Sequence, residues 1–219
     1  MSSRYYIAPE ARLEQAFDPE ELKFFQGLRA KFSGEIIPAD IVPVFISVQT
    51  EGWQSLFAAD QDLCSNLYGL RALRPMIWGF PNWAKMGMDF NLRWETDLDQ
   101  EIFSDSLRNR RVAAPATGFI QRTSAPPGHK KSRSLFTLPG HKLLFMAGMW
   151  ASFPNPLNGR IPPHFTILTT RSNDSLAPYH HRMPVILADG EVDDWLAGDD
   201  FHKYLEREQS DVMGEQWKC

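Results

Sequence analysis

Residues 110–122 read RRVAAPATGFIQR and contain two runs of strand length that meet at a single turn position. The first run covers residues 112–116 and the second covers residues 118–122, where Gly118 starts the new run. Further runs rich in apolar and β-branched residues follow at residues 143–150, 165–170 and 183–187. Short strands joined by short turns are typical of antiparallel sheets. This part of the chain therefore predicts an architecture dominated by antiparallel β-strands.

Three segments with helical spacing accompany the strands, at residues 9–32, 97–107 and 192–208. In the first segment, Asp18 can cap a helix whose first turn holds Pro19, and acidic residues follow it. Helices placed beside rather than between successive strands are typical of the α+β class.

Two earlier segments are less regular. Residues 41–48 read as a strand, and Pro43 places this strand at an edge or a bulge. Residues 74–87 contain several turn residues and read as a turn-rich tract. Together these patterns predict one α+β domain over residues 1–219, rich in antiparallel strands, with a C-terminal helix or tail at residues 198–219.

Composition limits the classes of protein that fit. The 219-residue chain has a net charge of −4, which argues against coating nucleic acid by bulk positive charge. Residues 108–133 nevertheless carry seven basic side chains and no acidic one, and such a stretch can hold a few phosphates. No apolar run is long enough to cross a bilayer, and Cys64 and Cys219 fit neither a disulfide framework nor a metal motif. We expect a cytoplasmic monomer without cofactor, metal or membrane partner.

Several separated segments resemble one known family, in that family's order. They include residues 78–81 (WGFP), 90–96 (FNLRWET), 110–119 (RRVAAPATGF), 146–150 (MAGMW), 165–170 (FTILTT) and 180–187 (HHRMPVIL). Each piece alone is weak, but the ordered set resembles the SOS-response-associated peptidase (SRAP) family, most clearly over residues 1–197. That resemblance implies a single domain whose mainly antiparallel strands form a curved sheet or partial barrel with flanking helices. It also implies a DNA-damage protein, found also in phages, that acts on abasic sites in single-stranded DNA.

The resemblance also implies a chemistry, from which this chain departs at two positions. In the family, removal of the initiator Met exposes a cysteine whose amine and thiol crosslink to the abasic aldehyde, and some members remove a short leader themselves. Here the second residue is Ser2, and Gln121 stands where the family has a glutamate. The implied catalytic set is thus Ser2, Asn91, Gln121 and His180. We expect the covalent crosslink to be lost or weakened, so that whether this member is an enzyme stays open.

The chemistry of these side chains supports a weakened reaction. The α-amine of Ser2, with a reference pKa of about 7.7–8.0, can form a Schiff base with an aldehyde, whereas its hydroxyl is a poorer nucleophile than a thiolate. Gln121 cannot transfer protons, although it can be an exposed strand residue with no role. His180 can act near neutral pH, and in an extended segment His181 would point away from it.

Other side chains suit a nucleic-acid partner. Asn91 and Arg93 would face one way on a strand, where an amide beside a guanidinium fits a sugar–phosphate backbone, or where Arg93 pairs with Glu95. Trp83 can stack on a base or wedge at a junction. The candidate DNA-binding residues are Arg4, Trp83, Arg93, Arg111, Lys130 and Arg182.

Two alternatives remain open from the sequence. One is a binding module for DNA ends, DNA junctions or protein that has no chemistry. The other is a hydrolase or peptidase in which the Ser2 hydroxyl attacks a carbonyl and its own amine acts as base. Motifs of triad hydrolases, zinc peptidases and P-loop enzymes do not occur in the chain.

Overall fold

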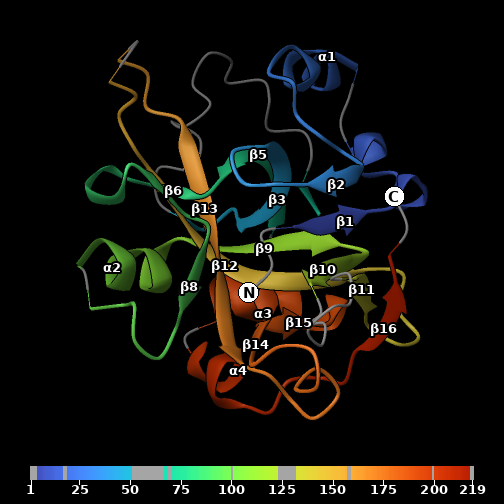
Figure 1. Cartoon of the computed structure of the whole chain (residues 1–219). Helices are drawn as coiled ribbons and strands as arrows, with labels where there is room; N and C mark the ends of the chain where they lie inside the picture. Colours follow the sequence, from blue (N-terminus) through green and yellow to red (C-terminus); the bar gives the residue numbers. More distant parts are fainter. Residues whose placement is uncertain are drawn as a thin grey trace.

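The computed structural model describes residues 4–16, 19–50, 67–68, 71–99, 101–122, 132–156, 159–198 and 200–217. The predicted class is confirmed, because the described chain combines two curved, mostly antiparallel sheets with a few short helices. Figure 1 shows helix α1 (Pro19–Gly27) at one end of the molecule and helices α3 (Val192–Ala197) and α4 (His202–Glu206) at the other, with the sheets between them.

The larger sheet has the strand order β14-β13-β12-β9-β3-β5-β4, to which β8 and β15 add. A parallel pairing of β13 with β5 joins two strands that are distant in this order, so β13, β12, β9, β3 and β5 form a closed ring. This closed ring agrees with the predicted curved sheet or partial barrel. Its strands are β3 (Ile41–Ser47), β4 (Leu67–Tyr68), β5 (Arg71–Trp78), β8 (Asn91–Arg93), β9 (Arg111–Ala116), β12 (Leu144–Ser152), β13 (Pro163–Arg171), β14 (Arg182–Pro184) and β15 (Ile186–Leu187).

The second sheet has five strands and receives the chain directly from the first at Thr117. The Thr117 hydroxyl accepts a hydrogen bond from the Ala8 amide at 2.8 Å, and the Thr117 amide donates one to the Tyr6 carbonyl. Gly118 follows, where a Cβ would lie 2.4 Å from the Phe136 carbonyl oxygen, so only glycine fits. The sheet order is β16-β11-β10-β1-β2, with β1 (Tyr5–Ile7), β2 (Gly34–Ile36), β10 (Gly118–Arg122), β11 (Arg133–Thr137) and β16 (Met213–Gln216).

Short helices and one hairpin cover the larger sheet. Helix α2 (Glu101–Asn109) packs on β12 and α3 packs on β9, where the Trp195 indole donates to the Val112 carbonyl at 2.8 Å. A two-stranded hairpin of β6 (Phe80–Asn82) and β7 (Gly87–Asp89) projects between β5 and β8. The single-turn helices are η1 (Pro9–Ala11), η2 (Leu13–Ala16), η4 (Trp83–Lys85) and η5 (Asp189–Glu191).

Three local predictions were wrong. The first half of the expected turn tract, residues 74–78, belongs to the buried strand β5. Strand β3, expected at an edge or a bulge, is not an edge strand, because it pairs with both β5 and β9, although Pro43 lies opposite Pro75 and outside the short pairing with β9. The expected helix over residues 192–208 is two helices, because α3 ends at Ala197 and the backbone is extended at Gly198, where any Cβ would lie 2.4 Å from the Asp194 carbonyl oxygen.

None of the helices within the described residues is long and apolar enough to cross a membrane.

The ring depends on a close approach of β12 to β13 at Gly148. A Cβ there would lie 2.3 Å from the Thr166 carbonyl oxygen and 2.9 Å from a Val112 methyl group. Gly148→Ala should therefore lower the free energy of unfolding by about 1–3 kcal/mol, as overpacking does in tight cores. Urea unfolding measures this loss. Gly190→Ala is the control, because a Cβ added at Gly190 would meet nothing within 4 Å; equal losses in the two variants would contradict the argument.

Candidate functional site

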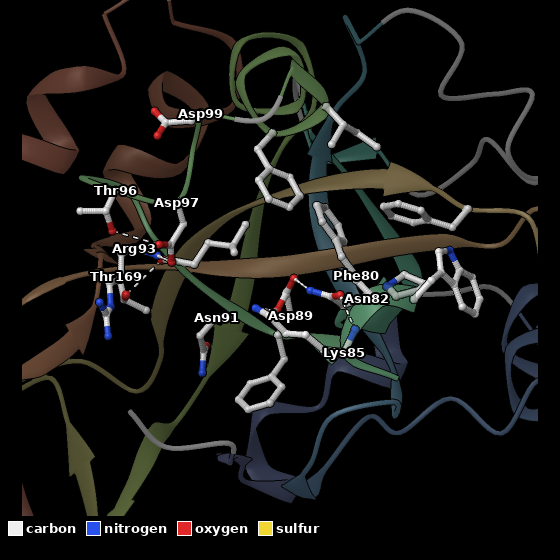
Figure 2. A pocket seen from close by; sticks show the side chains of 18 of the residues that line it. Phe80, Asn82, Lys85, Asp89, Asn91, Arg93, Thr96, Asp97, Asp99 and Thr169 are labelled. Carbon is white, nitrogen blue, oxygen red and sulfur yellow. Dashed lines mark hydrogen bonds and ion pairs between the residues drawn. The ribbon is translucent and has the colours of Figure 1, made fainter. Parts of the chain in front are cut away.

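A large open cleft of about 1050 Å³ lies beside the β6–β7 hairpin and strand β8. The turn after β8, the start of α2 and the adjoining parts of β13 and β14 complete its walls. Figure 2 shows two groups of polar side chains in it, one around Asn82, Lys85 and Asp89 and one around Arg93, Thr96 and Asp97, with Asn91 between them.

The hairpin wall is organised by Asn82. Its Oδ1 accepts the Lys85 amide at 3.0 Å, and its Nδ2 donates to Asp89 Oδ2 at 2.6 Å (Figure 2). Asp89 also lies 3.7 Å from the Lys85 ammonium. These contacts hold the short η4 turn, on which Trp83 is 62% exposed at the rim of the cleft. Trp83 is thus available for stacking, as the prediction requires.

Strand β8 forms the floor between the two groups. It runs parallel to β13, with Asn91 beside Ile167 and Arg93 beside Thr169, and both side chains line the cleft. Asp97 closes the turn that follows, because its Oδ2 accepts the Arg93 amide at 2.9 Å while its own amide donates to the Arg93 carbonyl. The exposed Arg93 side chain therefore stands on a fixed backbone.

The expected pairing of Glu95 with Arg93 was wrong, because Glu95 pairs with Arg182. The two carboxylate oxygens accept from the two terminal nitrogens of Arg182 at 2.9 and 2.7 Å, and Thr170 donates to the same carboxylate at 3.3 Å. Burial alone would raise the pKa of Glu95, but the hydrogen bonds and positive charge of Arg182 hold it below its usual value. Arg182 also donates to the Thr169 carbonyl and is only 9% exposed. Its guanidinium is thus engaged within the protein, which does not fit a primary phosphate contact.

His180 lies two residues before β14, outside any strand. Its Nδ1 lies 3.0 Å from the Arg182 amide nitrogen, and its ring stacks on His181 with centroids 4.5 Å apart. The expectation that His181 would point away was wrong, because the backbone bends at this position instead of continuing extended. Burial is the main factor that lowers the pKa of His180, so the ring is neutral near pH 7.

A second, small cavity lies against Arg4, the first described residue of the chain. Its lining includes Tyr5, Phe119, Pro184 and also Asn91, which therefore borders both cavities. Arg4 forms an ion pair with Glu35, and Arg133 reaches the same carboxylate at 3.1 Å. Burial would raise the pKa of Glu35, but Arg4 and Arg133 hold it below its usual value.

Besides Arg111, three predicted residues remain: Gln121, Ser2 and Lys130. Gln121 is 4% exposed on β10, so the interpretation as an exposed strand residue was wrong, and its Nε2 lies 3.4 Å from the Arg122 carbonyl oxygen. Ser2 and Lys130 lie outside the described residues. The structure thus gathers Asn91, Arg93 and Trp83 in the cleft, with Arg182 in its wall and His180 adjoining.

The structure does not fit Arg111 as a DNA contact. Arg111 is 5% exposed, and its guanidinium donates to the carbonyl oxygens of Leu107 at 3.0 Å and Gly198 at 2.8 Å. Further contacts reach the carbonyls of Arg108, Trp195 and Leu196, and the Phe201 ring lies 4.7 Å from its Cζ. Arg111 therefore satisfies the carbonyl groups at the C-terminal ends of α2 and α3.

The sequence did not indicate three other residues of the cleft, Asn82, Asp89 and Asp97. Asp89 and Asp97 organise the two polar groups, and Asn82 serves as a helix cap. An Asn directly before a short helical turn is a recognisable capping signal, but no local pattern indicates the contact of Asp89 with Asn82. Within the described ranges, no group of three or more His, Cys, Asp or Glu residues could hold a metal ion.

By its fold and its cleft, the chain is an α+β protein with a closed strand ring and a large open cleft among the residues that the structure describes. The family model described as "SOS response associated peptidase (SRAP)" matches residues 1–216, and the chain belongs to this family. The resemblance of the separated motifs is thereby confirmed.

The curated relatives share one description. The abasic site processing protein YoqW of Bacillus subtilis is 32% identical over 129 residues, which cover 57% of each chain. The abasic site processing protein HMCES of Gallus gallus is 28% identical over 152 residues, covering 58% of this chain and 45% of the relative. The matched region thus spans about half the length of these relatives.

Solved structures agree with the fold. A protein from Bacteroides thetaiotaomicron superposes with a TM-score of 0.71 at 17% identity, covering 99% of this chain and 92% of that one. A protein from Bordetella bronchiseptica gives a TM-score of 0.68 at 20% identity over the full length of both chains.

The role of Arg111 can be tested directly. Arg111→Gln should lower the free energy of unfolding by about 3 kcal/mol or more, because several buried carbonyl groups lose their donor. Thermal or urea unfolding measures the change, and the exposed neighbour Arg108, changed to Gln, is the control with little expected effect. A stable Arg111→Gln protein that has lost only DNA binding would show that Arg111 contacts phosphate after all.

Proposed function

We propose that this protein binds single-stranded DNA at abasic sites, with the cleft beside β8 holding the strand. Membership of the SRAP family and the abasic site processing relatives support this function. The observation that carries it is the position of Asn91, which borders both the large cleft and the small cavity at Arg4. A strand in the cleft would thus pass close to the point at which the N-terminal strand begins.

The cleft offers the two kinds of contact that a single strand needs. Arg93 and the largely exposed Lys85 can approach phosphates, and Trp83 presents an exposed ring on which a base can stack. Stacking does not depend on the identity of the base, so it suits recognition of damage rather than of sequence. Arg182 and Arg111 are not part of this proposed contact surface.

The proposed chemistry is a reversible amine–aldehyde reaction. After loss of Met1, the Ser2 amine attacks the aldehyde carbon of the ring-opened abasic sugar, water leaves, and a C=N bond forms. With Ser2 in place of a thiol and the buried amide of Gln121 in place of a carboxyl group, nothing converts this Schiff base rapidly into a stable ring. The adduct therefore returns to free DNA.

The first test mixes untagged protein with a single-stranded oligonucleotide that carries one abasic site, with and without borohydride. We expect a covalent band on a denaturing gel only with borohydride, because reduction traps the Schiff base as an amine. Intact mass spectrometry of the protein establishes whether Ser2 is the terminal residue. A free Ser2 without any trapped band would leave a binding protein without this chemistry, and absence of binding would exclude the proposed function.

Restoring the family residues should restore a lasting crosslink. The double variant Ser2→Cys, Gln121→Glu should give an adduct that survives without borohydride, because an amine and a thiol together close a thiazolidine. Each single variant separates the two contributions, and the expected order of increasing adduct lifetime is wild type, Gln121→Glu, Ser2→Cys, then the double variant. A double variant that still requires borohydride would show that the departures at these two positions are not what limits the reaction.

The hairpin should contribute to affinity through its aromatic tip. Trp83→Ala should raise the Kd for single-stranded DNA about 5- to 150-fold, the range expected when one stacked base loses its aromatic partner. Fluorescence anisotropy with a labelled oligonucleotide measures the change. Met86→Ala serves as the matched control on the same hairpin, since Met86 is 95% exposed and lies outside the cleft lining. An equal effect of both substitutions would argue against a specific stacking site.

A further inference from the structure

Glu95 occupies a position that links the two sides of the site across strand β13. At Thr169, β13 pairs with Arg93 of β8 on one side and with Pro184 of β14 on the other. The turn after β8 carries Glu95, and its carboxylate reaches Arg182 at the start of β14. The Glu95–Arg182 pair therefore joins two segments that β13 holds apart.

The pair is held on both sides by further contacts. Thr170 donates to Glu95 at 3.3 Å and lies 3.3 Å from the Trp94 indole nitrogen, while Arg182 donates to the Thr169 carbonyl. Two-point contact between a guanidinium and a carboxylate fixes the orientation of both groups. The backbone of Arg182 is consequently fixed with respect to β8.

The backbone amide and carbonyl of Arg182 both contact the His180 ring. The Arg182 amide can only donate, so Nδ1 must carry a lone pair to accept it at 3.0 Å. The Arg182 carbonyl oxygen lies 3.1 Å from the same nitrogen and could accept only from a protonated Nδ1. Of the two neutral tautomers, the Nδ1–H form would donate to the carbonyl and turn its hydrogen toward that of the amide, whereas the Nε2–H form accepts from the amide.

We propose that Glu95 is a positioning residue of the site, which acts through Arg182 to hold His180 as the Nε2–H tautomer. The role in catalysis rests on the proposed function, the amine–aldehyde reaction, and on the sequence-based prediction that His180 acts as an acid or base in it. Glu95 itself need not touch DNA. Its charge is required because a glutamine would present an N–H group to one arm of the Arg182 fork and lose that contact.

The chain contains a matched control for this substitution. Glu191 pairs with Arg207 in the same two-point manner, with one contact of 2.9 Å, and Glu191 is 29% exposed where Glu95 is 28% exposed. That pair lies at η5 and α4, away from the cleft. Glu95→Gln and Glu191→Gln therefore remove the same charge from equivalent pairs, of which only one adjoins His180.

The experiment measures ring ¹⁵N chemical shifts of His180, which distinguish the two tautomers, together with adduct formation on abasic DNA. In wild type and Glu191→Gln we expect the Nε2–H tautomer and equal rates of borohydride-trapped adduct formation. In Glu95→Gln we expect a mixture of tautomers and a rate at saturating DNA that is about tenfold lower, with the half-saturating DNA concentration nearly unchanged. Melting temperatures should fall by similar amounts in both variants.

Equal behaviour of the two variants in ring shifts and rate would overturn the proposal, because Glu95 would then have only a structural role. If Glu95→Gln does not fold, Arg182→Lys removes the two-point contact while keeping a cation, and the same outcome is expected. The ring shifts need no DNA, so they decide the placement of His180 even if wild type forms no adduct, a result that would instead contradict the proposed function.

Discussion

Strand β13 is the constraint on which the rest of the structure depends. Along one side it pairs first with β5 and then with β8, and along the other with β12 and then with β14. The pairing with β5 closes the ring, and the close approach at Gly148 allows β12 to lie against it. Because four strands take their register from β13, a shift of this strand would displace every group of the site together.

The cleft follows from the same arrangement. Strands β5 and β8 use successive parts of one edge of β13, so residues 79–90 between them must leave the sheet. They do so as the β6–β7 hairpin, which forms one wall of the cleft while β8 forms its floor. The groove is thus a consequence of topology, and its chemistry is added by Asn82, Asp89 and Asp97, which fix the surrounding turns.

The sequence predicted the strands because runs such as residues 112–116 and 165–170 are rich in apolar and β-branched residues, as buried strands are. The sequence could not assign roles to the arginines. An arginine that caps a helix and one that binds phosphate cannot be distinguished until their partners are known. For Arg111 those partners include Trp195 and Gly198, more than eighty residues away. Glu95 seemed suited to the nearby Arg93, but the turn closed by Asp97 directs it to Arg182.

The distribution of charge is compatible with the proposed DNA contact on an acidic protein. Three carboxylates at the site are used within the protein, Asp89 by Asn82, Asp97 by the Arg93 amide and Glu95 by Arg182, whereas Asp99 lines the cleft as an exposed side chain. Because the charge of those three carboxylates is balanced by local donors, they shape the walls and repel phosphate less than free carboxylates would. The net charge of −4 therefore does not describe the cleft. In the proposed binding mode, recognition depends on where Arg93 and Trp83 are held rather than on an excess of positive charge, and the turn contacts that hold them are as much a part of the site as the exposed groups.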